Sequence, residues 1–190
     1  MKYAHVKDGA VVRIIDLDAP PPPHKAAYIL PYVEDKPAFD PRNQRLTGPV
    51  DVIEQSQVVR RWSVEAIPRA DMVDRVGRER ERRLQLGFAY DFGDARGVHQ
   101  IGTTYSDMAG WDEVTSVAQA AINAGLSGME IAIVTDIGPV TVTALEWQSI
   151  LLAAGAARQP VWAASFAIQA LDPIPADYAD DARWPNAPGQ

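Results

Sequence analysis

The sequence predicts an α+β protein with a small β-rich N-terminal unit, a charged connector helix, and a C-terminal α+β domain of hairpins and three helices. Residues 1–67 carry short β-branched runs separated by turn residues, which is the pattern of hairpins. Residues 69–86 contain many arginines and acids but few large apolar residues, which indicates a solvated helix. Residues 88–171 change between strand and helix periodicity. We therefore expect domains at 1–67 and 68–171, followed by a tail at 172–190.

The first hairpin is expected at the very start of the chain. Residues 2–6 and 10–15 flank Asp8-Gly9, a dipeptide that tolerates the positive φ of a tight turn. Four consecutive prolines follow at residues 20–23. They favour the extended polyproline conformation, so we interpret them as a stiff spacer.

A second, looser hairpin is expected later in the β-rich unit. Its strands are residues 50–54 and 58–64, and a turn at residues 47–49 precedes them. Trp62 lies in the second strand, where a large ring can pack against the sheet.

The charged segment is expected to form a helix that ends at Gly87. Glu79 and Arg83 are spaced i, i+4 with the acid first, which is the stabilising order. The apolar stripe of this helix is thin, so the helix needs a partner surface, and we expect a second copy of the chain to supply it in a homo-oligomer. The candidate interface residues are Val73, Val76, Arg80, Arg83 and Leu84 in the helix, and Tyr178 and Trp184 in the tail.

The middle of the C-terminal domain predicts another hairpin and a helix. Residues 88–92 and 98–101 bracket a glycine-rich turn at 93–97. Asp107 is expected to cap the following helix, which ends near Gly125.

The strongest local signal is a hairpin that leads directly into a capped helix. Residues 129–134 and 139–142 are rich in β-branched residues and surround a short turn. Thr143 stands three residues before Glu146, which is the spacing of a capping box.

The helix after Thr143 is predicted to be apolar and to stop before Pro160, which would begin a final helix at 161–171. Residues 172–190 are acidic and interrupted by prolines, so we expect an extended tail. The candidate buried residues of the capped helix are Leu145, Ile150, Leu152 and Ala153.

Composition excludes several classes of protein. The 190 residues carry a net charge of −7, which argues against nucleic-acid binding because phosphate recognition needs a basic surface. No apolar run is long enough to span a membrane, and no secretory signal precedes the first strand, so we expect synthesis in a cytoplasm and no membrane insertion. Cysteine is absent, which excludes disulfides and thiolate sites.

Catalytic chemistry is not evident from the sequence. The three histidines lack the spacing of metal ligands, and the glycine segments lack a phosphate-binding pattern, so we expect no metal and no cofactor. His99 could lie near Asp91 or Asp94, which would raise its pKa, but a hydrogen-bonded structural histidine is favoured. These aspartates with Asp107 suggest glycoside hydrolysis as an alternative, although turn aspartates are far commoner. The five tryptophans are interpreted as core or interface anchors before sugar platforms.

The C-terminal half carries a series of motifs in a distinctive order: Arg82-Arg83, the glycine-rich hairpin at 88–101, a helix starting near Trp111, the strand at 131–134, and residues 142–147. The N-terminal half adds Asp8-Gly9 with residues 39–41, 46–48 and 58–64. With these motifs the C-terminal half, over roughly residues 78–171, resembles a domain of unknown function found in proteins of tailed bacteriophages and prophages, commonly encoded next to tail-fibre genes. The N-terminal half is similar to the leader of such proteins.

This resemblance implies a structural component of a phage or phage-like tail, in the fibre or baseplate region, rather than an enzyme. It implies a location in the virion tail after synthesis in the bacterial host cytoplasm, with other tail or fibre proteins as partners. The alternative is a tail-fibre assembly chaperone that is not retained in the virion. A glycan-binding or hydrolytic enzyme of the cell surface is the third reading.

Overall fold

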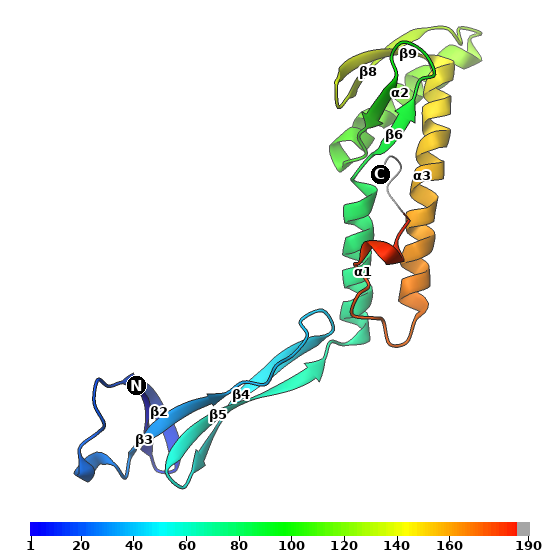
Figure 1. Cartoon of the computed structure of the whole chain (residues 1–190). Coiled ribbons are helices and arrows are strands. Elements are labelled where there is room, and N and C mark those ends of the chain that lie inside the picture. Colours follow the sequence, from blue (N-terminus) through cyan, green and yellow to red (C-terminus); the bar gives the residue numbers. More distant parts are fainter. Residues whose placement is uncertain (186–190) are drawn as a thin grey trace. The chain divides into compact units, whose positions relative to one another are not determined.

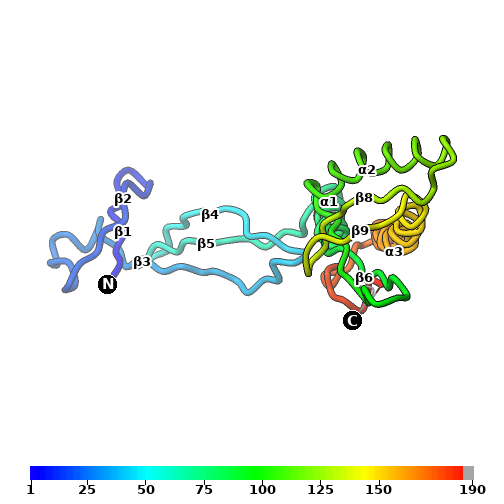
Figure 2. Tube along the Cα trace, turned by 90° about the horizontal axis from the view of Figure 1, so that it is seen from above, coloured from blue at the N-terminus to red at the C-terminus, as the bar shows by residue number. Residues whose placement is uncertain are grey.

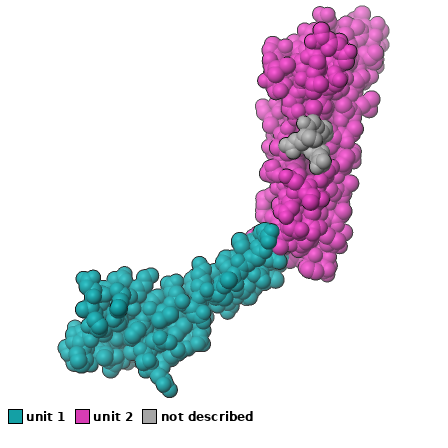
Figure 3. Space-filling view, viewed as in Figure 1, with its two compact units in different colours: residues 1–68 teal, residues 69–190 magenta. Residues whose placement is uncertain are grey.

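A computed structural model of the chain describes residues 1–185 (Figure 1). The described residues contain three α-helices and nine β-strands, which confirms the α+β class. The chain divides into two compact units, residues 1–68 and residues 69–190 (Figure 3). This division lies one residue from the boundary expected after residue 67. Within the described part of the chain, no helix is both long and apolar enough to cross a membrane.

Unit 1, residues 1–68, is built on one five-stranded sheet with the order β2-β1-β3-β5-β4. Strands β3 and β5 are parallel, and the other neighbouring pairs are antiparallel. The strand bounds are β1 (Lys2–Lys7), β2 (Ala10–Asp16), β3 (Ile29–Asp35), β4 (Gln44–Glu54) and β5 (Gln57–Ala66).

The expected first hairpin is confirmed as β1 and β2. Asp8 and Gly9 turn the chain with φ values of 51° and 76°, a left-handed conformation that favours this dipeptide. The core of the unit is small. Ala4 and Val58 are fully buried and pack with Tyr32, while the proline run leads into a single 3₁₀ turn, Pro23–Lys25.

Strands β4 and β5 form the second hairpin, which is tighter and longer than expected. They are joined by a two-residue turn, Gln55-Ser56, and Arg60 of β5 pairs with Asp51 of β4 at 2.7 Å. The turn expected at residues 47–49 is wrong: these residues lie inside β4 and form a bulge, where the pairing register shifts before Val50. Glycine and proline interrupt the ladder there without reversing the chain.

Unit 2, from residue 69 onward, is organised around helix α3 (Figures 1 and 2). Helix α1 lies along the C-terminal half of α3, and helix α2 with two hairpins packs against its N-terminal half. The element bounds are α1 (Arg69–Leu84), β6 (Phe88–Asp91), β7 (Val98–Ile101), α2 (Tyr105–Asn123), β8 (Glu130–Thr135), β9 (Gly138–Thr143) and α3 (Ala144–Ala170).

Both α2 and α3 begin with a capping box. Thr143 accepts the N–H of Glu146 at 3.1 Å, and the Glu146 carboxylate accepts the N–H of Thr143 at 2.7 Å, as the spacing predicted. In α2 the N-cap is Thr104, and Asp107 is the third helical residue, so the expectation that Asp107 itself is the cap is wrong. Its carboxylate still accepts the N–H of Thr104, at 2.9 Å.

Two tryptophans form the centre of the unit 2 core. Trp147 of α3 is almost completely buried and meets Trp111 of α2 edge to face, with ring centroids 5.2 Å apart. The indole N–H of Trp147 donates to the Thr115 hydroxyl at 2.9 Å, so its one polar atom is satisfied. Ile150 and Ala154 continue the same buried face along α3.

Helix α3 is one continuous helix of 27 residues that contains Pro160. The separate helix expected at residues 161–171 is therefore wrong. Buried residues before the proline, such as Ala154, and after it, such as Ser165 and Ile168, lie on one face of α3. Packing of that face offsets the cost of a proline in a helix, which is roughly 3 kcal/mol.

The face of α3 that was expected to be buried is only partly so. Ile150 is buried as predicted, but Leu145 and Leu152 are exposed at 57% and 77%. The two leucines are seven residues apart, so they share one face of the helix. At about 100° per residue this face lies roughly opposite Trp147.

The C-terminal segment is not the extended tail that was expected. Residues 172–185 fold back along unit 2 through turns and a short 3₁₀ helix, Asp181–Arg183 (Figure 1). Ile174 and Trp184 are buried, and Arg183 pairs with Asp177 at 2.7 Å. The remaining part of the predicted tail, 186–190, lies outside the described residues.

Candidate functional site

The apolar residues predicted as an interface on α1 are used inside unit 2. Val76 is fully buried and Leu84 nearly so. Both lie in the helix that packs on α3, where the Gln169 side chain donates to the Val73 carbonyl at 3.4 Å. Met72, which the sequence reading did not single out, is buried in the same helix. The partner surface that α1 needs is therefore α3 of the same chain.

Arg80 contacts an aromatic ring of α3. Its guanidinium lies over the Trp162 ring at 3.9 Å from the centroid, and it also pairs with Glu81 at 2.7 Å. A guanidinium stacked on tryptophan at this distance makes a cation–π interaction. Arg80 thus joins α1 to α3.

Arg83 fastens the C-terminal segment to α1. Its side chain is only 8% exposed and pairs with Glu79 at 2.7 Å and with Asp181 at 2.8 Å. It also donates to the Ala179 carbonyl at 2.9 Å and lies 5.0 Å from the centre of the Trp184 ring.

Trp184 and Tyr178 complete this contact. The indole N–H of Trp184 donates to the Tyr178 carbonyl at 2.7 Å, and the Trp184 ring is buried. Arg83, Leu84 and Trp184 are therefore engaged within the chain. We correct the expectation that they contact a second molecule: the chain's own C-terminal segment and α3 occupy that role.

Glu79 is the carboxylate at the centre of this arginine cluster. Burial disfavours its ionised form, but hydrogen bonds from Arg82 and Arg83 outweigh burial and hold the pKa of Glu79 below its usual range. The pKa of Arg82 is raised by the same hydrogen bond to Glu79. Glu79 and Arg82 are therefore both charged at neutral pH.

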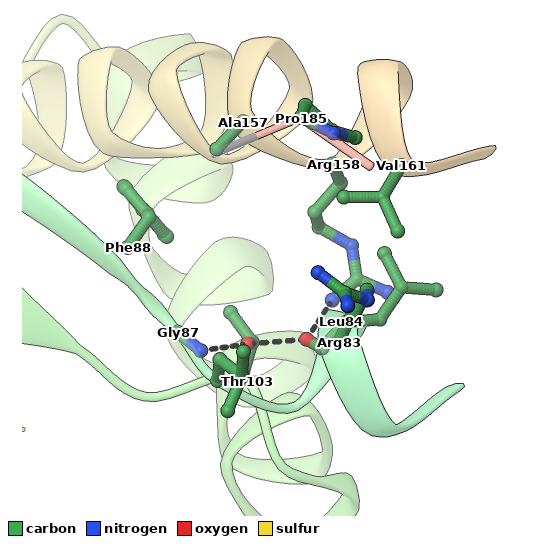
Figure 4. A pocket seen from close by; sticks show the side chains of 10 residues that line it. Arg83, Leu84, Gly87, Phe88, Thr103, Ala157, Arg158, Val161 and Pro185 are labelled. Atoms are coloured by element: carbon green, nitrogen blue, oxygen red, sulfur yellow. Dashed lines mark hydrogen bonds between the residues drawn. The ribbon is translucent and has the colours of Figure 1, made fainter. Parts of the chain in front are cut away.

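A small cavity lies at the C-terminal end of α1 (Figure 4). Its volume is about 30 Å³, enough for ordered water and too small for a substrate. The Thr103 hydroxyl donates to the Leu84 carbonyl at 2.6 Å and accepts the N–H of Gly87 at 3.0 Å (Figure 4). Gly87 is required there, since a Cβ would lie 2.5 Å from the Ile101 carbonyl oxygen. The residues around this cavity therefore have a structural role: they fix the end of α1 against the loop that contains Thr103.

The residues considered for catalysis have structural partners. The two ring nitrogens of His99 contact the Thr135 hydroxyl at 2.8 Å and the Arg96 carbonyl at 3.0 Å, so its partners are not Asp91 or Asp94. Asp91 accepts a backbone N–H in its turn, and Asp94 pairs with Arg96. Within residues 1–185 no cluster of three metal-ligating side chains is present.

Arg96 connects the first hairpin of unit 2 to the start of α3, a link that the sequence reading missed. It pairs with Asp94 and with Glu146 and donates to the Thr141 carbonyl at 2.9 Å. The hydrogen bond from Arg96 lowers the pKa of Glu146. The two residues are 50 positions apart, so no local sequence pattern could reveal the pair.

An open strand edge adjoins a groove between α2 and β8. The hollow has a volume of about 340 Å³ and is lined by Trp111 on the helix side and Ala132 and Val134 on the strand side. Val134 is paired with Pro139, which has no N–H, so this is a non-hydrogen-bonded pair and the N–H and C=O of Val134 point away from β9. By alternation the same holds for Ala132. The groove therefore exposes unpaired strand backbone.

The outer face of α3 is an exposed apolar surface of unit 2. We define the outer stripe as eight of the ten exposed residues of α3, leaving out Pro160 and Ala167, which are exposed at its border. It carries no charged side chain. Its three large members are exposed at 57%, 77% and 58%. The outer stripe consists of Leu145, Ser149, Leu152, Ala156, Gln159, Ala163, Phe166 and Ala170.

The chain matches no protein-family model, no curated protein and no solved structure at a significant level. The outer stripe of α3 and the open edge of β8 are therefore described from this chain alone. The resemblance to the tailed-phage domain stays a prediction from its motifs.

Proposed function

We propose that this protein is a structural component of a bacteriophage or phage-like tail, in the fibre or baseplate region, and that it acts by attaching to other proteins. Its partners would be other tail or fibre proteins, and its final location the virion tail after synthesis in the host cytoplasm. The observation that carries the attachment role is the outer stripe of α3. The sequence resemblance supports the phage context.

The outer stripe favours attachment because the exposure of apolar side chains to water is unfavourable and a protein partner would bury them. Helix α3 has only two charged residues in 27, Glu146 and Arg158. Glu146 pairs with Arg96, and Arg158 donates to the Leu84 carbonyl at 3.3 Å, so both are used inside unit 2. Exposed apolar surface that is contiguous along a helix is typical of protein–protein contact sites.

The test is the protein content of purified particles. We expect this polypeptide to be present in washed particles in a fixed ratio to a known tail protein. A matched Leu152→Glu variant should be depleted from particles while its level in the lysate is unchanged, because a charge in the outer stripe opposes docking. Particles that lack the wild-type chain altogether would overturn the structural role.

The second candidate is a tail-fibre assembly chaperone, and the open edge of β8 favours it. An extended segment of a folding fibre chain could add to β8 as a strand, with its side chains in the groove beside Trp111. The charged residues that line this groove, Asp107 and Glu113, are acidic. The groove therefore suits an uncharged or basic segment.

A proline at the strand edge separates the two candidates. Val134→Pro removes an N–H that points away from β9, so the hairpin keeps its ladder while the edge can no longer pair at that position. Under the chaperone role this variant loses fibre binding in lysate and the yield of folded fibre falls. Under the structural role, Val134→Pro is incorporated normally and Leu152→Glu is not.

A further inference from the structure

We infer that the outer stripe of α3 binds a second copy of this chain, with the two α3 helices packed antiparallel. This inference rests on the proposed attachment function and names the partner of that surface. It replaces α1, which is occupied within the chain, as the contact between copies.

The outer stripe has the spacing of a coiled-coil seam. From Leu145 to Ala170 its eight members follow one another at alternating intervals of four and three residues. This is the heptad pattern of a and d positions, with no charged residue among them. A seam of this kind is complementary to another helix rather than to a flat surface.

Residue size selects the antiparallel arrangement. In an antiparallel pair centred between residues 157 and 158, each layer holds one a position and one d position. Every layer then combines a larger side chain with a smaller one, which fills the space evenly. A parallel pair would instead stack leucine on leucine and alanine on alanine, which leaves gaps. The antiparallel layers are Leu145 with Ala170, Ser149 with Phe166, Leu152 with Ala163, and Ala156 with Gln159.

The central layer contains a matched polar pair. Residue 160 is proline and has no N–H, so the carbonyl of Ala156 has no donor one turn ahead in its own helix. In the antiparallel register Gln159 of the second copy lies opposite this carbonyl, and its amide N–H can donate to it. A single polar pair of this kind fixes the register of a helix pair.

The available area predicts a reversible dimer. At a rise of about 1.5 Å per residue the helix is about 40 Å long, and a contact strip about 10 Å wide buries roughly 800 Å² in total. Stable interfaces bury about 1,200–2,000 Å². The exposed side chains of Leu126, Met129 and Leu171 extend the apolar surface at the two ends of α3. Association should therefore be concentration-dependent.

Salt separates this contact from one made by the charged helix. Each chain carries a net charge of −7, and the outer stripe is uncharged, so salt screens the general repulsion without weakening the contact. An α1–α1 contact held by ion pairs would weaken as salt rises. We expect association to be equal or stronger at high salt.

The first experiment is sedimentation of the full-length protein over a range of concentrations. Leu152→Glu should raise the dissociation constant by roughly 10- to 100-fold, the equivalent of one buried leucine. Tyr105→Glu is the matched control, because Tyr105 is 70% exposed on α2 outside the stripe. A wild-type chain that stays monomeric at the highest concentration, or a dimer unaffected by Leu152→Glu, overturns the inference.

The second experiment reads orientation by oxidative cross-linking, which the absence of native cysteine makes possible. A Leu152→Cys chain mixed with a differently tagged Ala163→Cys chain should form a mixed disulfide dimer, while neither variant links to itself. Self-linking of Leu152→Cys would show a parallel pair and overturn the antiparallel inference. The proposed function fails separately: a dimer absent from particles refutes the tail role, whereas a monomer present in particles refutes only the second-copy contact.

Discussion

Helices α1 and α3 lie side by side and use their surfaces in opposite ways. Helix α1 carries six arginines and four acids among 16 residues, and α3 carries one of each sign among 27. The charged helix has its apolar stripe and key arginines occupied within the chain, whereas the uncharged helix keeps an exposed apolar stripe. From this difference we argue that a high density of charge is a poor guide to an attachment surface. The surface that we propose is the one whose side chains have no partner within the chain.

The physical reason for this contrast is the kind of partner that each side chain needs. An arginine such as Arg83 is long and makes several contacts at once, so nearby carboxylates and rings within the chain satisfy it. A leucine such as Leu152 can be satisfied only by another apolar surface, and the inner side of α3 already uses those of unit 2. The following predictions test this contrast.

The largest effect is expected on the inner side of α3. Trp147→Ala should lower the free energy of unfolding by about 3–5 kcal/mol, because the buried ring leaves a cavity beside Trp111. Urea unfolding followed by far-UV circular dichroism measures this. An unchanged midpoint would mean that the ring does not hold the core.

Arg83→Met is expected to cost about 1–3 kcal/mol, because it removes hydrogen bonds to Glu79 and to the C-terminal segment. Limited proteolysis should then cut the chain within residues 172–185 earlier than in the wild type. Arg78→Met is the matched control on the exposed side of α1 and should stay within about 0.5 kcal/mol. Equal effects of the two variants would contradict the special role of Arg83.

Thr143→Ala should lower stability by about 1 kcal/mol through loss of the N-cap of α3. Thr143→Ser keeps the hydroxyl and should restore most of that stability. If both substitutions behave alike in thermal melts, the cap does not contribute.

Acid should weaken unit 2 through Glu79 and Glu146. The folded-state pKa of each is lowered, chiefly by arginine hydrogen bonds, from an ordinary value of 4.5. Their contribution is therefore complete above pH 4.5 and is lost as pH falls through the lower folded-state values. Unfolding free energies measured across this range should decline toward acid. The decline should be shallower in Glu146→Gln, and an identical slope would show that this pair is not linked to folding.

The smallest effect is expected on the outer stripe. Leu152→Ala should change the stability of the dilute protein by no more than about 0.5 kcal/mol, whereas Ile150→Ala, two residues away on the inner side, should cost about 2–5 kcal/mol. Denaturant titrations at low protein concentration compare the two. A large loss for Leu152→Ala would mean that the outer stripe is covered within the chain.

Local sequence signals predicted the elements well, because their causes are local. Asp8-Gly9 turns the first hairpin, and the Thr143 and Glu146 spacing begins α3 at the expected residue. The prediction that a new helix begins after Pro160 is wrong, because tertiary packing of Ser165 and Ile168 outweighs the preference of proline for the first turn of a helix. Arg83 also contacts Ala179 and Asp181 in the C-terminal segment, which lie about 100 residues away in the chain, so no pattern in α1 could predict those contacts.

The proposed attachment surface was itself within reach of the sequence. The intervals of seven residues between Leu145, Leu152 and Gln159, together with the scarcity of charge, are visible in the chain. The sequence places Leu145 and Leu152 among the buried residues, because periodicity alone does not tell which face of an apolar helix is buried. Only the packing of Trp147 on the other side decides this.

The central claim is that attachment uses the outer stripe of α3 and not the arginine helix. The most direct measurement is the sedimentation of two variants beside the wild type, Leu152→Glu on α3 and Arg78→Glu on the exposed side of α1. We predict that the wild type and Arg78→Glu show the same concentration-dependent rise in mass, and that Leu152→Glu reaches the same mass only at a concentration roughly 10- to 100-fold higher. A monomeric Arg78→Glu beside a Leu152→Glu variant that still associates would place the contact on α1 and contradict the account.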